Sequence, residues 1–279
     1  MKNQKIWFIT GASKGLGLTL IKLLLSKGNK VAATSRNAGD IEKQIKHENL
    51  LALTTNLADD KSVHEAISQT INKFGKIDVA VNNAGYSLYG SVESLSDDEF
   101  RQIMDINFFG TVNVIRNVMP FLRNQKSGHI INISSVAGYK GYGNSPAYAS
   151  TKFAVIGLSE ALAEEVKAFN VKVTVVAPGF FRTDFLNKGT DLICKNPISE
   201  YRIETLLNWL NENNGKQTGD PKKLANHLIE ITNLENPPIH LLMGQDAYQI
   251  IAEKRNAENE EFEVWKELTF STNMDTTKD

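Results

Sequence analysis

Short apolar runs rich in β-branched residues recur along the chain and alternate with longer amphipathic stretches. The runs lack alternating polar residues, which is typical of parallel strands buried on both faces, and the stretches between them are long enough for crossover helices. Seven strands are predicted, at residues 6–10, 31–34, 50–54, 77–81, 129–133, 171–176 and 239–242. The pattern predicts an α/β fold in which a doubly wound (Rossmann) parallel sheet of seven strands carries helices on both faces.

Helix starts are marked at two places by capping residues. Ser96, with Glu99 three residues later, predicts a capped helix that runs toward Leu122. Asp220 followed by Pro221 predicts an N-cap with proline at the first helical position. These signals support the alternation of strands and helices.

Two segments depart from that alternation. Residues 180–219 mix aromatic and turn residues with one short amphipathic piece, and such a long insertion predicts a lid over a substrate site. Residues 245–279 form a charged tail in which Phe262, Trp265 and Leu268 recur at helical spacing. We expect this tail to be a helix docked on the body, with a solvated acidic face.

The totals fit one globular domain spanning residues 1–279. Of these residues 41% are hydrophobic and 23% are charged, and the formal net charge is -1. Basic residues are dispersed and no long apolar run occurs, so neither a nucleic-acid nor a membrane partner is expected. Cys194 is the single cysteine and strand-like sequence starts near Lys5, which favours a cytoplasmic protein without a cleaved leader. The histidines show no metal-ligand spacing, so no metal is expected.

A glycine-rich turn follows the first predicted strand and opens a helix. Glycines allow a tight turn and a close approach to a pyrophosphate, which the free N–H groups of the helix start can bind. An ordinary strand-to-helix turn is the alternative interpretation of three glycines. The position on the first strand of a parallel sheet favours a dinucleotide, with contacts predicted from Gly11, Ser13, Lys14, Gly15, Leu16 and Gly17.

Basic residues stand where the second strand ends. A site for NAD places a carboxylate there, but this chain has Ser35 and Arg36. The guanidinium of Arg36 suits a 2′-phosphate, and Lys14 can add a second positive charge. The cofactor predicted is therefore NADP(H), unless both cations are merely solvated.

Tyr148 and Lys152 lie four residues apart at the start of a predicted helix, which places them on one face. An ammonium nearby favours the phenolate and lowers a tyrosine pKa from its usual value near 10. Such a pair can act as general acid in reduction and general base in oxidation. An exposed pair without function is the alternative, because this spacing is common.

Several motifs in order resemble the classical branch of the short-chain dehydrogenase/reductase (SDR) family, over residues 5–244. They are the Thr10 to Gly17 turn, Asn82-Asn83-Ala84-Gly85, Asn107, Ser134-Ser135, Tyr148 with Lys152, and Pro178-Gly179 with Thr183.

That resemblance implies a catalytic set of Asn107, Ser135, Tyr148 and Lys152. Ser135 is preferred to its neighbour Ser134 because it lies thirteen residues before Tyr148, as in the family. Ser135 would polarise the substrate oxygen, Tyr148 would exchange the proton, Lys152 would also bond the nicotinamide ribose, and Asn107 would orient a water.

The resemblance also implies cofactor contacts outside the glycine turn. They are Asn83, Ala84 and Gly85 along the adenosine ribose, and Pro178, Gly179 and Thr183 at the nicotinamide end. One departure is Asn56-Leu57, where the family has an acidic residue before the apolar residue that contacts adenine. The amide oxygen of Asn56 can still accept from the adenine amino group.

The substrate is expected to be an apolar ketone, aldehyde or secondary alcohol. The residues predicted to face it, besides Ser135, are Tyr86, Tyr142, Phe181 and Leu186, with Leu88, Phe180 and Phe185 nearby. Packing of these aromatics against the body alone is the other interpretation. The implied activity is that of an NADP(H)-dependent carbonyl reductase.

Two rival functions stay open. One is a nucleotide-sugar epimerase or dehydratase, which shares the Tyr-x-x-x-Lys pair but usually has a further substrate domain. The other is a protein that senses NADP(H) without turnover. The resemblance also implies a homodimer or homotetramer, paired through residues 96–122 and 148–169.

Overall fold

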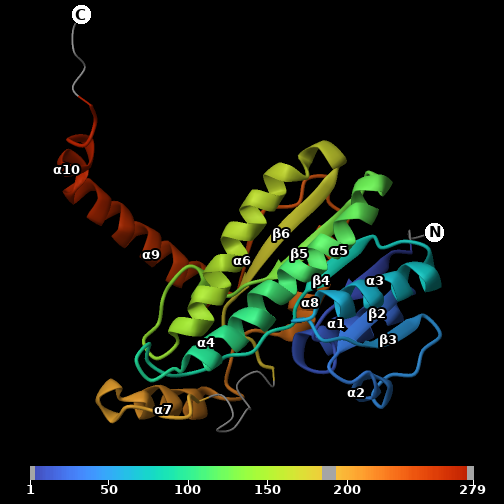
Figure 1. Cartoon of the computed structure of the whole chain (residues 1–279), viewed down its shortest axis with the longest axis horizontal. Helices are drawn as coiled ribbons and strands as arrows, with labels where there is room; N and C mark the ends of the chain where they lie inside the picture. The colour runs from blue at the N-terminus through green and yellow to red at the C-terminus, as the bar shows by residue number, and fades with distance from the viewer. Residues whose placement is uncertain (1–3, 184–192, 275–279) are drawn as a thin grey trace, which may run out of the picture.

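The strands form one sheet of seven in which every neighbouring pair is parallel (Figure 1). The structure is a computed structural model and describes residues 4–183 and 193–274. The strands are β1 (Ile6–Ile9), β2 (Lys30–Ser35), β3 (Leu50–Thr54), β4 (Val79–Asn82), β5 (Gly128–Ile133), β6 (Val171–Pro178) and β7 (His240–Met243). All seven predicted strands are present, so the predicted fold is confirmed.

Helices connect these strands and cover both faces of the sheet. They are α1 (Gly15–Ser26), α2 (Gly39–Glu42), α3 (Asp60–Phe74), α4 (Asp97–Met104), α5 (Gly110–Gln125), α6 (Pro146–Glu165), α7 (Ile203–Asn213), α8 (Pro221–Ile231), α9 (Gln245–Val264) and α10 (Lys266–Phe270). Short 3₁₀ turns are η2 (Val136–Gly138), η3 (Lys167–Phe169) and η6 (Ser199–Tyr201), and η1 (Asp105–Phe109) is a π-helix. In the described ranges, no helix is both long and apolar enough to cross a membrane.

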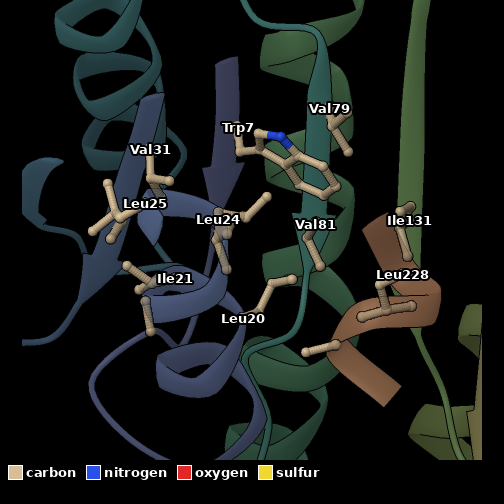
Figure 2. Packing of buried hydrophobic residues seen from close by; sticks show 14 of the residues in the cluster. Trp7, Leu20, Ile21, Leu24, Leu25, Val31, Val79, Val81, Ile131 and Leu228 are labelled. Atoms are coloured by element: carbon tan, nitrogen blue, oxygen red, sulfur yellow. The ribbon is translucent and has the colours of Figure 1, made fainter. Parts of the chain in front are cut away.

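Successive residues of each central strand point to opposite faces and so build two cores. Trp7 and Ile9 of β1 pack with α1 and α8, as the close view in Figure 2 shows for Trp7, Leu24 and Leu228. Phe8, between them, joins the core under α3, α5 and α6. Both faces of the strands are buried in this way, which explains why the strands lack polar alternation.

Both predicted helix starts have the expected capping bonds. Ser96 Oγ accepts from Glu99 N, while the Glu99 carboxylate accepts from Ser96 N at 3.0 Å, so a complete capping box opens α4. Asp220 accepts from Lys222 N and caps α8. The helix predicted from Ser96 toward Leu122 differs in one respect, because η1 interrupts it between α4 and α5.

The strand order β3-β2-β1-β4-β5-β6-β7 changes direction between β1 and β4. The chain winds from β1 outward to β3, then crosses to the other side of β1 to build β4 to β7. At such a switch point the loops leave in opposite directions and a crevice opens at the carboxyl ends of the strands. The glycine turn lies at this point.

The two segments that depart from the strand–helix alternation differ from their predictions. Residues 180–219 contain a helix, and most of the C-terminal tail does not contact the body. Within residues 180–219 the structure has η6 and α7, while Phe185 and Leu186 lie outside the described residues. The prediction of a docked tail is wrong at Phe262, Trp265 and Leu268, which are all exposed. Only the first turns of α9 pack on the body, through Ala247 and Ile251, because the helix then projects away from the sheet (Figure 1).

Candidate active site

The glycine turn after β1 has a backbone that requires glycine. Gly11 and Gly15 have φ of +65° and +55°, in the left-handed region. A Cβ at Gly11 would lie 2.6 Å from Ala84 Cα, and one at Gly17 would lie 2.5 Å from Gly11 O. The turn therefore brings its backbone against β4 and leaves its outer side open to a ligand.

Thr10 and Asn83 tie this turn to the end of β4. The Asn83 amide donates to Thr10 O at 2.9 Å and to Gly11 O at 3.0 Å. Thr10 Oγ1 accepts from the N–H groups of Asn83 and Ala84. The predicted contact residues Asn83 and Ala84 are thus held beside the turn.

The start of α1 offers unsatisfied N–H groups. Lys14 is its N-cap in an extended conformation, and its side chain makes no capping bond. The first N–H groups of a helix lack intrahelical partners and attract anions. At Gly15, the first residue of the helix, a Cβ would meet only Thr183 Cβ, at 3.8 Å, so these residues leave room for a dinucleotide pyrophosphate.

Exposed side chains surround the part of this crevice where the sequence predicts the adenosine end of a cofactor. Arg36 follows β2 and Lys14 follows β1, and both are exposed. Ser35 Oγ donates to Asn37 O, which fixes the loop that carries Arg36. At the end of β3 the Asn56 amide oxygen accepts from Ala58 N at 3.2 Å, so it shapes its own turn. Its second lone pair remains for a ligand.

Tyr148 and Lys152 lie one turn apart on α6 at the carboxyl edge of the sheet. Lys152 Nζ is 5.6 Å from the centre of the Tyr148 ring and donates to Ile133 O, at the end of β5, at 2.9 Å. A hydrogen bond joins the hydroxyl of Tyr148 to that of Ser135. The structure therefore brings Ser135, Tyr148 and Lys152 together, as the sequence predicted.

Burial controls the charges of this group. It raises the pKa of the Tyr148 phenol well above its usual value, and the Ser135 hydrogen bond offsets only part of that. Burial also lowers the pKa of Lys152 to about 8. Desolvation of the phenolate therefore moves the Tyr148 pKa in the direction opposite to the lowering by Lys152 that the spacing predicted.

Asn107 lies in the π-helix η1 and is buried. Its amide group bonds the backbone of Tyr86 in both directions, accepting from N at 3.0 Å and donating to O at 2.9 Å, and also donates to Thr151 Oγ1. A Cβ at Gly85 would lie 3.2 Å from Asn107 Oδ1 and 3.5 Å from Lys152 Nζ. Asn107 thus lies beside Lys152, and single-turn π-helices are frequent at functional sites.

The two adjacent serines differ in what they contact. Ser134 is buried and donates to Lys152 O at 2.9 Å, so its hydroxyl anchors α6. Ser135 Oγ accepts from Ala137 N and faces Tyr148. This placement agrees with the choice of Ser135 for contact with a substrate oxygen.

Asp246 is a positioning residue that the sequence did not reveal. Its carboxylate accepts from Phe180 N at 2.6 Å and lies so close to Gly179 that a Cβ there would collide with it. Gly179 N also donates to Met243 O, so Pro178 and Gly179 are fixed at the end of β6. The sequence signal at Asp246 was only that of an acidic residue in a first helical turn.

An apolar wall surrounds Tyr148. Its buried members include Leu88 and Cys194, with Tyr86 and Ile193 packed against them. Tyr89, also missed from the sequence, is buried with Ile203 of α7.

The predicted substrate residues do not share one location. Tyr86 lies in the wall, and Tyr142 has a buried hydroxyl without a hydrogen-bond partner. Phe181 packs instead against the core formed with α1 and α8 and against Gly219, so the structure does not bring it to Tyr148. Leu186 lies outside the described residues.

Known proteins share both the sequence and the fold. Residues 5–191 match the sequence model of the short chain dehydrogenase family. The chain belongs to that family. An oxidoreductase of Botryotinia fuckeliana, BOA17, is 34% identical over 271 residues, which cover 96% of this chain and 99% of the relative. The 3-ketodihydrosphingosine reductase of Bacteroides thetaiotaomicron is 33% identical over 254 residues, covering 90% and 92%.

Two solved structures have a similar fold. One from Streptomyces avermitilis has a TM-score of 0.90 at 28% identity and covers 98% of this chain and 100% of its own. ElxO with NADP bound has a TM-score of 0.72 at 30% identity and covers 86% and 96%.

Proposed function

We propose that this chain is an NADP(H)-dependent carbonyl reductase that transfers hydride between the nicotinamide and an apolar ketone, aldehyde or secondary alcohol. The observation that carries the proposal is the Ser135–Tyr148 hydrogen bond beside Lys152 and Asn107, at the crevice that the glycine turn opens. NADP(H), when bound, supplies or accepts the hydride.

The residues of the chain account for the rest of the chemistry. Ser135 and Tyr148 hold the carbonyl oxygen between two hydroxyls, and Tyr148 gives it a proton as hydride reaches the carbon. Burial favours a protonated phenol, which suits an acid in the direction of reduction. Lys152 keeps a positive charge near the ring that loses the proton, which stabilises the developing phenolate.

NADP(H) is favoured by Arg36 and Lys14 at the adenosine end. The cations are exposed, and no ion pair within the described residues engages them. The 2′-phosphate of NADP(H) accepts charge-assisted hydrogen bonds from a guanidinium, whereas the 2′-hydroxyl of NAD(H) carries no charge to pair with it.

An apolar substrate is favoured by the wall around Tyr148. Leu88, Tyr86 and Ile193 leave few polar groups to bind a charged substrate. Helix α7 continues this wall, with Leu206, Leu207 and Leu210 packed toward Tyr89. The reductase from Bacteroides thetaiotaomicron bears a name that denotes a long-chain keto substrate, which has the same apolar character.

Substitution of Tyr148 tests the mechanism. Tyr148→Phe removes the proton donor and keeps the ring, so we expect turnover of an apolar ketone to fall by at least about 100-fold. NADPH affinity, measured by fluorescence titration, is expected to stay nearly unchanged. Tyr248→Phe, at an exposed tyrosine of α9, is the matched control. Substantial turnover by Tyr148→Phe would refute this mechanism, and a wild type that binds NADPH but reduces no carbonyl compound would favour a sensor.

A further inference from the structure

Glu99 is a buried carboxylate whose two oxygens contact distant parts of the chain. It lies in the first turn of α4, and 8% of its surface is exposed. Oε2 accepts from Ser96 N at 3.0 Å and from Ser96 Oγ at 2.8 Å, which are bonds of the helix cap. Oε1 accepts from Lys195 N at 2.8 Å. The same carboxylate therefore caps α4 and holds a backbone N–H that is 96 residues away in sequence.

The contact with Lys195 makes a demand on residue 99 that the helix cap does not make. A capping box works with glutamate or with glutamine, because the cap needs one acceptor oxygen from that side chain. In this structure donors meet both oxygens of Glu99, and an amide offers only one acceptor oxygen. A buried donor left without an acceptor is unfavourable. The two contacts together therefore favour a carboxylate over an amide.

The residues just before Lys195 belong to the apolar wall around Tyr148. Cys194 is a buried member of that cluster, and Ile193 packs against it together with Tyr148. Ile193 forms a parallel bridge with Tyr89, and Cys194 N donates to Tyr89 O at 2.7 Å. Lys195 N is the next N–H along the chain, and it is the one that Glu99 holds.

The bond to Lys195 N fixes the end of this short segment. Cys194 is held on its own side, since Cys194 Sγ lies 3.3 Å from Ser94 Oγ and a Cβ at Gly90 would lie 2.7 Å from the sulfur. Lys195 itself is exposed, so the bond is made where the wall meets solvent. Local opening requires less free energy where such bonds are lost. Loss of the Glu99 acceptor would therefore loosen the wall from this end.

We propose that Glu99 is a positioning residue for the substrate, because its Oε1 fixes residues 193–195 and thereby the wall that orients an apolar ketone against Tyr148. This inference rests on the proposed function. With the anchor in place, Ile193 limits the positions that a small ketone takes beside Tyr148. Without the anchor the site is wider, so a small ketone is oriented less often and a bulky ketone finds more room.

A comparison of Glu99→Ala with Ser96→Ala tests the anchor. Both substitutions remove bonds of the capping box, but only Glu99→Ala removes the acceptor of Lys195 N. Hydrogen exchange of the Lys195 amide, followed by mass spectrometry of overlapping peptides, measures the anchor directly. We expect exchange about 10-fold faster in Glu99→Ala than in the wild type, and little change in Ser96→Ala. This measurement needs neither cofactor nor turnover.

Steady-state kinetics with a small and a bulky apolar ketone test the consequence for the substrate. In Glu99→Ala we expect KM for the small ketone to rise about 10-fold and kcat to change less than about twofold, which shifts the preference toward the bulky ketone. The dissociation constant of NADPH should stay that of the wild type. Ser96→Ala should keep the wild-type preference, because its Lys195 anchor is intact.

Faster exchange and a shifted preference, both confined to Glu99→Ala, would support the proposal. Unchanged exchange at Lys195 in Glu99→Ala, or equal changes in Glu99→Ala and Ser96→Ala, would show that Glu99 acts as a cap alone and would overturn it. Faster exchange with an unchanged KM for both ketones would overturn it as well, since the anchor would then not orient the substrate.

Two further outcomes are separated from these. If Glu99→Ala does not fold, Glu99→Gln takes its place, because glutamine completes a capping box but has no second acceptor; unchanged Lys195 exchange and unchanged KM in Glu99→Gln would overturn the proposal. A wild type that binds NADPH but reduces neither ketone would refute the proposed function and with it the substrate role of Glu99. The exchange measurement distinguishes that failure from loss of the anchor.

Discussion

At the scale of single residues, the environment of Tyr148 differs most from what its neighbours in sequence suggest. Lys152 lies one turn away and contacts the ring face. Burial nevertheless raises the pKa of Tyr148 and lowers the pKa of Lys152, so it favours the neutral form of both groups. A spacing of four residues predicts that two side chains meet, but the degree of desolvation depends on the apolar wall that Leu88 and Ile193 build from distant segments. The sequence therefore identified the pair but not its protonation.

The pKa of Lys152 predicts a pH dependence of carbonyl reduction. Burial lowers that pKa to about 8, while the Tyr148 phenol stays protonated well above this pH. The ammonium is lost as pH rises through about 8, so we expect kcat for reduction at saturating NADPH to fall there. Values of kcat for carbonyl reduction, determined between pH 6 and pH 10, measure this fall. In Lys152→Arg the guanidinium stays charged, and the fall near pH 8 should vanish from the remaining activity. An unchanged profile in that variant would assign the fall to another group.

Arg36 predicts a selective effect on the cofactor. Arg36→Ala removes a charge-assisted hydrogen bond to the 2′-phosphate, which is worth about 1.5–3 kcal/mol, so NADPH should bind roughly 10- to 150-fold more weakly. NADH lacks that phosphate and should bind as before. The dissociation constants of NADPH and NADH measure this effect, and Arg123→Ala, at an exposed arginine in the last turn of α5, is the control. Equal losses for NADPH and NADH would refute the NADP(H) assignment.

At the scale of elements, most helices and strands follow from local signals, whereas interruptions do not. The capping box at Ser96 and Glu99 opens α4 as predicted. The π-helix around Asn107 was not predicted, because its extra residue per turn is stabilised by bonds to Tyr86 and Thr151, which belong to other segments. Helix α7 was only partly predicted, since its apolar face shows a helical period but its packing on Tyr89 depends on the tertiary structure.

A buried histidine between β5 and β6 predicts that the protein loses stability in acid. His129 is buried, with Nε2 2.9 Å from Thr174 Oγ1, and burial lowers its pKa to about 4 from 6.5. The unfolded chain binds this proton more readily, so the stabilisation is present above pH 6.5 and is lost as pH falls toward 4. We expect the free energy of unfolding to drop by about 2 kcal/mol between pH 7 and pH 5 from this group.

Urea unfolding at the two pH values measures that loss. His129→Gln should show a smaller drop between pH 7 and pH 5 than the wild type. His227→Gln is the control, because the side chain of His227 is exposed and its Nδ1 lies 2.7 Å from the Glu230 carboxylate at the surface. A drop of the same size in all three proteins would show that His129 does not cause it.

At the scale of the whole molecule, strand order decides where the functional groups meet. Residues from the glycine turn, Asn83, Ser135 and Tyr148 are far apart in sequence and come together because β1, β4 and β5 are neighbours in the sheet. The tertiary structure also decides which apolar side chains are exposed. The tail has an apolar stripe typical of a docked helix, but its direction away from the body leaves Phe262 and Trp265 exposed. The apolar stripe predicted packing on the body, and the direction of the tail decided otherwise.

The sequence by itself determined the parallel sheet, its seven strands and the glycine turn that follows the first of them, because buried strands and left-handed glycines leave local patterns. It also named Ser135, Tyr148 and Lys152, through the order of motifs that the chain shares with its family. Only the tertiary structure decided the raised pKa of Tyr148, the support of Gly179 by Asp246, the packing of Phe181 away from Tyr148 and the projection of the tail. Each of these depends on contacts or desolvation between segments distant in sequence, which no local pattern records.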